Sequence, residues 1–571
     1  MGIRERHSFD KVLSTYEDLR NERQEWEAEW RTISDFLLPG RGIYQTYSNP
    51  RKRKLTTQNI INTIGEDSLN ILTSGLHGRL TSPAMPWFRL GWIDDRVVEN
   101  EQFKAWLQDG DKQLNSQLHK SNFYSVINSF YVEFAGFGTA CLYLGEDSDP
   151  SDSAFRFELL TAGEYAFSLS ADGKLAVFCR TIFMSKRQLV ERFGRRVSEQ
   201  VRREVSENRS GIDKTDLAII EYVARDQYQD KEFVRFFYEV CSSGKQEVKL
   251  YERPLEVSGF YEMPYFVARW GTIGSDVYGI GPGSRAIPDI RRLQEMEKAF
   301  LMATHKTINP PLNAPAKMRG KLNTLPGGKN YYSNPQEKIE PIYAVNFDYN
   351  GVSAAIERVE QRIQKNFYND VFLTAMRDPN ASPLRTGQVQ VQEQEQMFRL
   401  GPIVERLGSE LFEPMLRRGF KILERKQILQ PLAPEARQMA GEFSISMISP
   451  LAVAQRKIKA QGTDAFMQFI GAAAQFDQSI IDNVDPDAAT RQRADIEGVD
   501  LGILRPQAEV AKIREARAKK QAEDEQLARE MAVAEAQGNN QVNSATARKT
   551  SAEAGQILVE TGQTAREAQL Q

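Results

Sequence analysis

Residues 275–300 read SDVYGIGPGSRAIPDIRRLQEMEKAF, and this stretch decides the class of fold. Its three glycines, Gly279, Gly281 and Gly283, lead directly into a run in which apolar residues recur at helical spacing. A glycine-rich turn before a helix can cradle a phosphate, which would indicate a nucleotide-binding enzyme. It can also be a backbone hinge that begins a helix, which would indicate a structural role.

The glycine spacing favours the hinge. A Walker loop needs Gly-Lys-Ser/Thr, but Gly283 is followed by Ser-Arg. A dinucleotide loop needs Gly-x-Gly-x-x-Gly in a βαβ unit, whereas Gly281 and Gly283 are two residues apart. Proline suits a first helical turn, and we expect Pro288 there. We predict a hinge of Gly279, Gly281, Gly283 and Pro288, in which the glycines provide unusual backbone angles and close packing.

The composition bounds the class of protein. The chain has 571 residues, with 74 Lys and Arg against 77 Asp and Glu. It is too long for one core and too evenly charged for a generally polybasic protein. Cys141, Cys179 and Cys241 are far apart and form no CxxC pair, which favours a reducing compartment. No signal peptide and no membrane helix are recognised, so we expect a soluble, intracellular chain.

Hydrophobic periodicity predicts an α+β fold that is predominantly helical. Between about 154 and 270, short runs rich in β-branched and aromatic residues predict a mostly antiparallel sheet. One helix interrupts these runs; Ser185 and Gln188 are expected to form its capping box, and Gly194 lies just past its end. The helices expected before the sheet cover residues 9–38, 58–80, about 99–118 and a stretch that begins near Ser121.

The sequence that follows the glycines predicts a hairpin of two helices with a long insert at its tip. Helical patterns at 285–305 and 351–376 flank an insert, 306–350, that has too many prolines to be helical. The insert interleaves basic and aromatic residues, which suits nucleic acid or an acidic protein partner, and the sequence leaves both open. The residues concerned are Lys317, Arg319, Lys321, Lys329, Tyr331 and Tyr332.

The remainder is expected to be helical. A long helix is predicted at about 388–427, interrupted at the "LGP" of 400–402. Further helices follow from 455, with breaks at "NVDPD" and "RPQ". The tail from about 511 is rich in Ala and Gln and carries almost no core residues, so it is helical only against copies of itself and otherwise disordered.

Catalytic and metal-binding patterns are missing from the sequence. His7, His77, His119 and His305 are dispersed, and neither HExxH nor G-x-S-x-G occurs. The acidic run at 146–152 lacks EF-hand spacing. The basic run at 51–54 has no stacking aromatics, so a solvated loop is favoured over a phosphate contact. We therefore predict no catalytic residue, no metal and no cofactor.

Four blocks in order resemble the head-to-tail connector, or portal, family of short-tailed bacteriophages. They are ERQEWEAEWRTISDFLLP at 22–39, GEDSLNILTSGLHGRLTSPAMPWFRL at 65–90, DVYGIGPGSRAIPDIRRL at 276–293 and the helix that starts TGQVQVQEQEQMFRLGP at 386. The resemblance covers about residues 5–460 and rests on the order of the blocks, because no single motif is catalytic.

The resemblance implies a portal architecture and a ring of about twelve subunits at one capsid vertex. Its parts would be a wing with a β-rich region (1–284), two stem helices (285–305 and 351–376), a clip (306–350), a tunnel loop (377–388), a wing-crossing helix (389–454), a crown (455–510) and a helical barrel or disordered tail (511–571).

The resemblance also implies a non-enzymatic role in genome packaging, retention and ejection. Double-stranded DNA would pass through the channel, and Arg377 and Arg385 beside the tunnel loop would contact it or pair with carboxylates of a neighbouring subunit. The ring would dock terminase and then tail adaptor proteins, and would contact the major capsid and scaffolding proteins, with no membrane. Assembly would take place in the host cytoplasm and the mature site would be the portal vertex of the virion. The alternatives are a nucleotide-binding enzyme and a virion scaffold or tail protein without a channel.

Overall fold

The computed structural model describes most of the chain. The described residues are 7–41, 60–92, 101–147, 153–207, 216–243, 248–331, 334–335, 338–342, 348–373, 399–429, 443–448, 462, 465–475, 480, 484–497, 505 and 507–567. Two compact units are distinguished, Met1–Pro486 with Ile496–Gly498, and Asp487–Asp495 with Val499–Gln571. The first unit contains all of the strands described below.

The first four long helices surround an apolar core. They are α2 (Phe9–Phe36), α3 (Ile64–Leu80), α5 (Glu101–Lys120) and α6 (Phe123–Phe137). Helix α6 is the most deeply buried, because aromatic side chains such as Phe123, Phe130 and Phe134 recur on it and lose all contact with water. The predicted positions of these helices lie close to the observed ones, although α3 begins at Ile64 rather than at 58.

Two antiparallel sheets confirm the predicted α+β class. A three-stranded sheet has the order β10-β2-β3, and a six-stranded sheet has the order β4-β5-β6-β7-β8 with β9 also paired to β7. The strands are β2 (Thr139–Glu146), β3 (Phe155–Leu160), β4 (Tyr165–Leu169), β5 (Leu175–Ser185), β6 (Asp216–Tyr228), β7 (Lys231–Ser243), β8 (Val248–Leu250), β9 (Glu256–Phe260) and β10 (Tyr265–Arg269). Strand β2 precedes the predicted β region, which was placed from 154 onward.

The helical interruption of the large sheet matches the prediction. Helix α7 (Lys186–Phe193) begins with a capping box in which the Gln188 backbone N–H donates to Ser185 Oγ at 3.3 Å. The Ser185 backbone N–H in turn donates to Gln188 Oε1 at 3.1 Å, and Gly194 ends the helix. A 3₁₀ turn, η2 (Gly194–Arg196), and helix α8 (Glu199–Ser206) follow.

A small two-stranded sheet joins distant parts of the chain. Strand β1 (Phe88–Trp92) pairs antiparallel with β13 (Phe443–Met447), so Phe88 lies opposite Met447. The prolines of "TSPAMPWF" end α3 as predicted, but the segment then turns inward. Trp87 stacks on Phe123 with ring centroids 5.8 Å apart. The sequence did not predict either strand.

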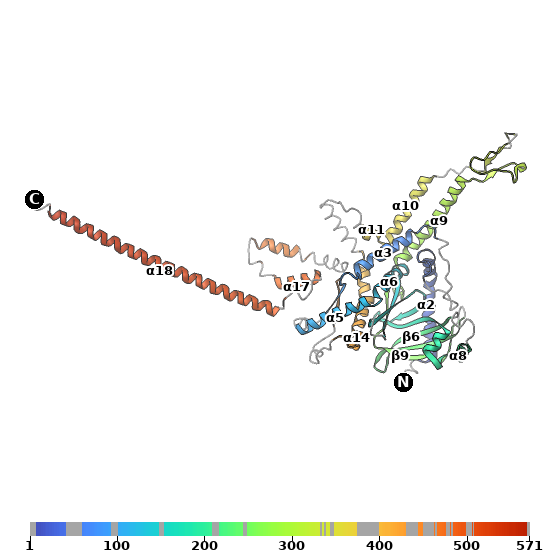
Figure 1. The fold of residues 1–571 in the computed structure, drawn as a ribbon, viewed down its shortest axis with the longest axis horizontal. Helices are drawn as coiled ribbons and strands as arrows, with labels where there is room; N and C mark the ends of the chain where they lie inside the picture. Colours follow the sequence, from blue (N-terminus) through green and yellow to red (C-terminus); the bar gives the residue numbers. More distant parts are fainter. Residues whose placement is uncertain are drawn as a thin grey trace. The chain divides into compact units, whose positions relative to one another are not determined.

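The helical hairpin is present (Figure 1). Helix α9 (Pro282–Ile308) and helix α10 (Tyr349–Asn366) lie side by side, and a small module with strands β11 (Leu312–Asn313) and β12 (Glu340–Pro341) sits at their far end. The second helix was predicted to run unbroken over 351–376. It instead stops at Asn366, because Tyr368 adopts a left-handed backbone with φ of 55°, and the short helix α11 (Asn369–Leu373) follows.

The predicted interruption at "LGP" coincides with the start of a helix, because 399–400 form a turn and Leu400 is the N-cap of the helix that follows. Helix α13 (Gly401–Leu407) carries Pro402 in its first turn, where proline is tolerated. A π-helical turn, η6 (Gly408–Phe412), then passes into α14 (Glu413–Arg425) without a break. The portion predicted at 388–398 lies outside the described residues.

The second unit is dominated by one long helix. Helix α18 (Gln507–Glu567) has 61 residues, and nearly all of its described side chains are exposed. Near its start Arg514 pairs with Asp487, at 2.6 Å between Nη1 and Oδ2; Asp487 belongs to α17 (Pro486–Glu497). Among the described residues, no helix is both long and apolar enough to cross a membrane.

Candidate functional site

The glycine stretch that precedes α9 is packed against the end of α6. A Cβ atom on Gly281 would lie 2.8 Å from the Ala135 carbonyl oxygen, and one on Gly279 would lie 2.5 Å from that of Gly138. A Cβ atom on Gly283 would overlap the carbonyl oxygen of Gly136. These contacts are backbone to backbone and leave no space for a side chain. We call Gly136, Gly138, Gly279, Gly281 and Gly283 the glycine joint.

Hydrogen bonds fix the glycine joint on both sides. The Gly279 N–H donates to Thr139 Oγ1 at 2.7 Å, and the Trp270 N–H donates to the Gly138 carbonyl at 2.8 Å. Only Gly138 among the five joint glycines has a positive φ, 78°. The predicted unusual backbone angles at Gly279, Gly281 and Gly283 are therefore wrong, while the predicted close packing is correct.

The proline assignment also changes. Helix α9 begins at Pro282, which occupies the first turn, so Pro288 lies inside the helix in its second turn. Proline at this point removes the N–H that the Ser284 carbonyl would accept. Pro288 is exposed, and its ring faces away from the core.

The geometry disfavours a phosphate cradle. A phosphate-binding turn needs backbone N–H groups that face open space at a helix N-terminus. Here the Gly279 N–H is taken by Thr139, and the backbone of Ala135–Gly138 occupies the space against Gly281 and Gly283. The nucleotide-binding alternative thus loses its site.

A cluster of polar side chains ties the segment before α3 to both hairpin helices. Gln294 Oε1 accepts from the backbone N–H groups of Ile61, at 2.7 Å, and Asn62, at 3.0 Å. Asn62 Nδ2 donates to Glu297 Oε1 on α9 at 3.0 Å and to Glu360 Oε1 on α10 at 2.9 Å. No local pattern predicts this anchor, because Ile61 and Asn62 lie more than 230 residues before their partners on the hairpin.

One stripe of α9 is buried at its base and exposed further out. Ile287, Gln294, Leu301 and Ile308 recur every seven residues and so share one face. The first two are buried, whereas Leu301 is 44% and Ile308 76% exposed. The distal half of this face has no cover within the described part of the chain.

The tip of the hairpin is a small exposed module. Asn330 Nδ2 donates to the Asn323 carbonyl at 2.7 Å and closes a loop, while β11 and β12 pair beneath it. The predicted partner residues gather on this module: Arg319, Lys321, Lys329 and Tyr331 are exposed, Tyr331 by 81%. The Lys317 backbone lies in the 3₁₀ turn η3 (Ala316–Met318), and Tyr332 lies outside the described residues.

The other predicted residues form no chemical site. Arg377 and Arg385 lie outside the described residues. His7 pairs with Asp226 at 3.1 Å, and burial lowers the pKa of His77. Within the described ranges, no group of three His, Cys, Asp or Glu side chains could hold a metal ion.

Comparison with known proteins gives consistent results along the chain. Residues 10–504 match the family described as bacteriophage head to tail connecting protein. The chain is 31% identical over 526 residues to the probable portal protein of Bordetella phage BPP-1, which covers 90% of this chain and 92% of that protein. It is 30% identical over 521 residues to the portal protein of Salmonella phage epsilon15, covering 89% and 91%.

Proposed function

The chain belongs to the family of bacteriophage head to tail connecting proteins, and on that premise we propose that the α9–α10 hairpin is the stem of a ring-shaped channel. The function of the chain is that of a phage portal, the head-to-tail connector. Family membership points to a structural rather than an enzymatic role in the virion, at the capsid vertex.

The exposed half of the α9 stripe supports the ring. Leu301 and Ile308 continue the face that Ile287 and Gln294 bury at the base of the hairpin. Burying an exposed Leu or Ile side chain stabilises an assembly by about 1.5–3 kcal/mol. Cyclic symmetry repeats this gain at every interface, so a neighbouring hairpin is the natural cover for the stripe.

For the finer architecture we adopt the expectations drawn from the sequence. Residues 1–284 would form the wing, and the glycine joint would connect it rigidly to the stem. The tip module would be the clip that docks terminase during packaging and tail adaptor proteins afterwards. Arg377 and Arg385 would contact the passing DNA, and α18 would pack against its copies as a barrel. Contacts with capsid and scaffolding proteins and assembly in the host cytoplasm complete the proposal.

The mass of the purified protein in solution tests the ring. Native mass spectrometry should give one closed oligomer, a fixed multiple of the 64.9 kDa chain. Leu301→Glu should shift the protein to monomers and small oligomers without unfolding it. Ala299→Glu is the matched control, because it places the same carboxylate on the exposed opposite face of α9. A wild-type protein that stays monomeric, or an assembly indifferent to Leu301→Glu, would contradict the proposal.

The two alternatives differ in measurable ways. A scaffold or tail protein without a channel would give open or variable assemblies. A nucleotide enzyme would bind ATP or NAD tightly and would hydrolyse ATP without terminase. Turnover of that kind would contradict a passive portal.

A further inference from the structure

Different helices cover the two faces of the six-stranded sheet. Successive side chains of a strand point to opposite faces, so Ile219 and Ile220 of β6 lie on different sides. Ile220 packs in a buried cluster with residues of α2, namely Val12, Tyr16 and Leu19. Ile219 packs in a separate cluster with residues of the α7–α8 segment, namely Leu189, Phe193, Val197 and Val201. The solvent-facing sides of α2 and of the α7–α8 segment therefore point away from each other.

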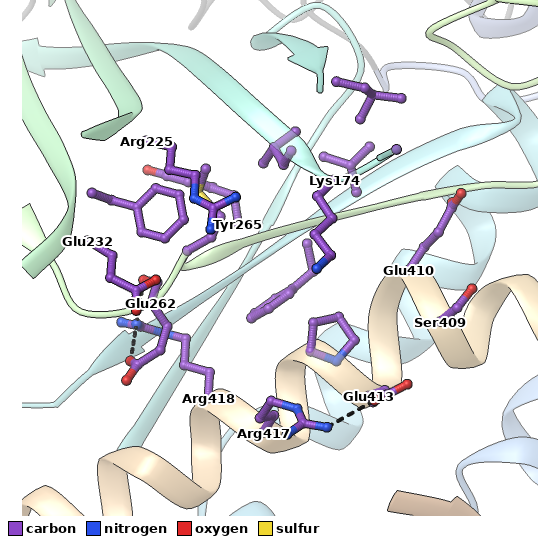
Figure 2. A pocket seen from close by; sticks show the side chains of 18 of the residues that line it. Lys174, Arg225, Glu232, Glu262, Tyr265, Ser409, Glu410, Glu413, Arg417 and Arg418 are labelled. Carbon is purple, nitrogen blue, oxygen red and sulfur yellow. Dashed lines mark hydrogen bonds and ion pairs between the residues drawn. The ribbon is translucent and has the colours of Figure 1, made fainter. Parts of the chain in front are cut away.

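Two ion pairs in a cavity of about 600 Å³ show how charges are balanced within this unit of the chain. Figure 2 shows Arg418 directed at Glu262 and Arg417 at Glu413. The shortest nitrogen–oxygen distances in these pairs are 3.0 and 3.1 Å. Arginines neutralised in this way leave little charge for a partner. The outer sides of α2 and of the α7–α8 segment are different.

Helix α2 carries an acidic stripe on its outer side, which consists of Asp18, Glu22, Glu25 and Glu29. The four residues are spaced by four, three and four positions, so they share one face of the helix. None of them makes a side-chain hydrogen bond or ion pair within the described residues. Partial burial and the nearby Glu25 carboxylate raise the pKa of Glu22, as expected where like charges lie close together.

The cations of α2 do not neutralise the acidic stripe. Arg20 and Arg23 are buried, and Arg31 pairs with Glu27 at 3.6 Å. Lys11 is exposed, but it precedes the stripe by two helical turns, or about 10 Å. This separation is about one Debye length at 0.1 M salt, so most of the attraction is screened. The outer side of α2 is therefore negative.

The α7–α8 segment carries a basic cluster on its outer side, which consists of Arg192, Arg195 and Arg196. All three are exposed, and none pairs with a carboxylate within the described residues. The Arg192 guanidinium lies 5.0 Å from the ring centroid of Phe237, and Arg196 donates to the Leu255 carbonyl at 3.2 Å. These contacts hold two of the arginines in place without neutralising them.

The carboxylates near the basic cluster leave it positive. Glu204 binds Lys186, and Glu199 binds Arg203 on α8. Glu191 is the only carboxylate in the sequence of α7, and one such group does not balance three arginines. The sheet thus has a negative surface beyond one face and a positive surface beyond the other.

We propose that the acidic stripe of one subunit docks on the basic cluster of the next subunit around the ring. The inference rests on the proposed function, because it needs a ring. In a cyclic assembly each subunit uses two different surfaces, one toward each neighbour. Opposite charges that point away from each other meet this requirement, and complementary potentials favour the head-to-tail order. A second copy accounts for both surfaces, whereas nucleic acid accounts only for the arginines, since the acidic stripe repels phosphates.

Reversal of charge on either surface tests the proposal, with native mass spectrometry of the full-length protein at about 0.1 M salt. Glu22→Lys with Glu25→Lys should raise the subunit concentration for half-assembly at least about tenfold, because like charges then face each other. Arg192→Glu with Arg195→Glu should do the same. The chain that carries all four substitutions should assemble again, because its basic α2 meets the acidic α7–α8 surface of its neighbour.

A matched control and salt separate electrostatic docking from a change in folding. Asp172→Lys with Asp230→Lys changes as many exposed charges in the turns that follow β4 and β6, on neither surface, so assembly should not change. Raising the salt to about 1 M shortens the Debye length to about 3 Å, so each paired reversal should lose its effect. Should loss of the Phe237 contact unfold the arginine variant, Arg195→Glu alone replaces it.

The outcomes distinguish the docking from the ring. A wild-type protein that stays monomeric would contradict the ring and the docking together. Wild-type rings that neither reversal weakens, or a fourfold variant that assembles worse than both pairs, would contradict the docking alone. Loss of duplex DNA binding in the arginine variant with unchanged assembly would assign the basic cluster to nucleic acid and also overturn the docking.

Discussion

Glycines have different structural roles in the glycine joint and in the tip module. At the joint, Gly281 and Gly283 are buried, and a methyl group on either would strike the backbone of α6. At the tip, Gly320 and Gly327 have a φ of 77°, and a Cβ atom on them would meet nothing within 4 Å. The joint uses glycine to bring two backbones together, whereas the tip uses it to turn the chain. The difference predicts a rigid base and an adaptable end for the same hairpin.

Substitution at the joint should have the largest effect. Gly283→Ala forces α9 away from α6, and overpacking of this kind costs about 3 kcal/mol or more when only backbone can move. Chemical denaturation at fixed protein concentration measures the loss. Gly78→Ala is the control: it lies exposed in α3 with open space around it and should gain up to about 1 kcal/mol. Equal effects of the two variants would contradict the interlocked joint.

Two asparagines extend the comparison to side chains. Asn62→Ala should lower the free energy of unfolding by about 2 kcal/mol, because it removes the donor that Glu297 and Glu360 share in a part-buried site. Asn330→Ala breaks two equally short bonds to Asn323, but these are exposed, so the change should stay within about 0.5 kcal/mol. A larger loss at the tip than at the anchor would reverse the comparison.

A buried carboxyl group at the base of the hairpin should make the free energy of unfolding depend on pH. Burial raises the pKa of Glu133, which lies on α6 beside the joint, above its ordinary value of 4.5. The folded chain then holds this proton more tightly than the unfolded chain, so the contribution of Glu133 to stability falls as the pH rises from about 4.5 through the raised pKa. Glu133→Gln should flatten that slope in denaturation curves across the acidic range. An unchanged slope would show that other groups cause it.

Charge reversal at the tip should leave stability nearly unchanged. Replacing Arg319, Lys321 and Lys329 by Glu alters exposed side chains only, so the free energy of unfolding should change by less than about 0.5 kcal/mol. The same triple variant should lose co-sedimentation with a tail adaptor or terminase. Unfolding of the variant would contradict the expectation of unchanged stability. Normal docking by the variant would contradict the proposed role of the tip module.

Local patterns in the sequence were sufficient for some features and insufficient for others. Local spacing over a few residues was enough to predict helices α2 and α9 and the Ser185 capping box, because helical periodicity and capping depend on near neighbours in the sequence. Strands β1 and β13 are more than 350 residues apart in sequence, and each is only five residues long, so neither carries a recognisable signal alone.

The glycine joint shows the same limit at the candidate site. The stretch at 279–283 was identified, but its partner, Gly136 and Gly138 in "FAGFGTA", was not, because nothing local indicates that these two glycine-containing stretches meet. The expectation of Pro288 in the first turn failed because the helix starts at Pro282, three residues before the predicted start at 285. The break at Tyr368 comes from a left-handed tyrosine that propensity does not foresee.

Electron microscopy of the purified full-length protein tests the central claim most directly. The account predicts closed rings with a central channel, in which the α9–α10 hairpins of neighbouring subunits cover the Leu301 stripe and the tip modules form one rim. Monomers, open filaments, or closed rings whose Leu301 stripes remain exposed to solvent would contradict it.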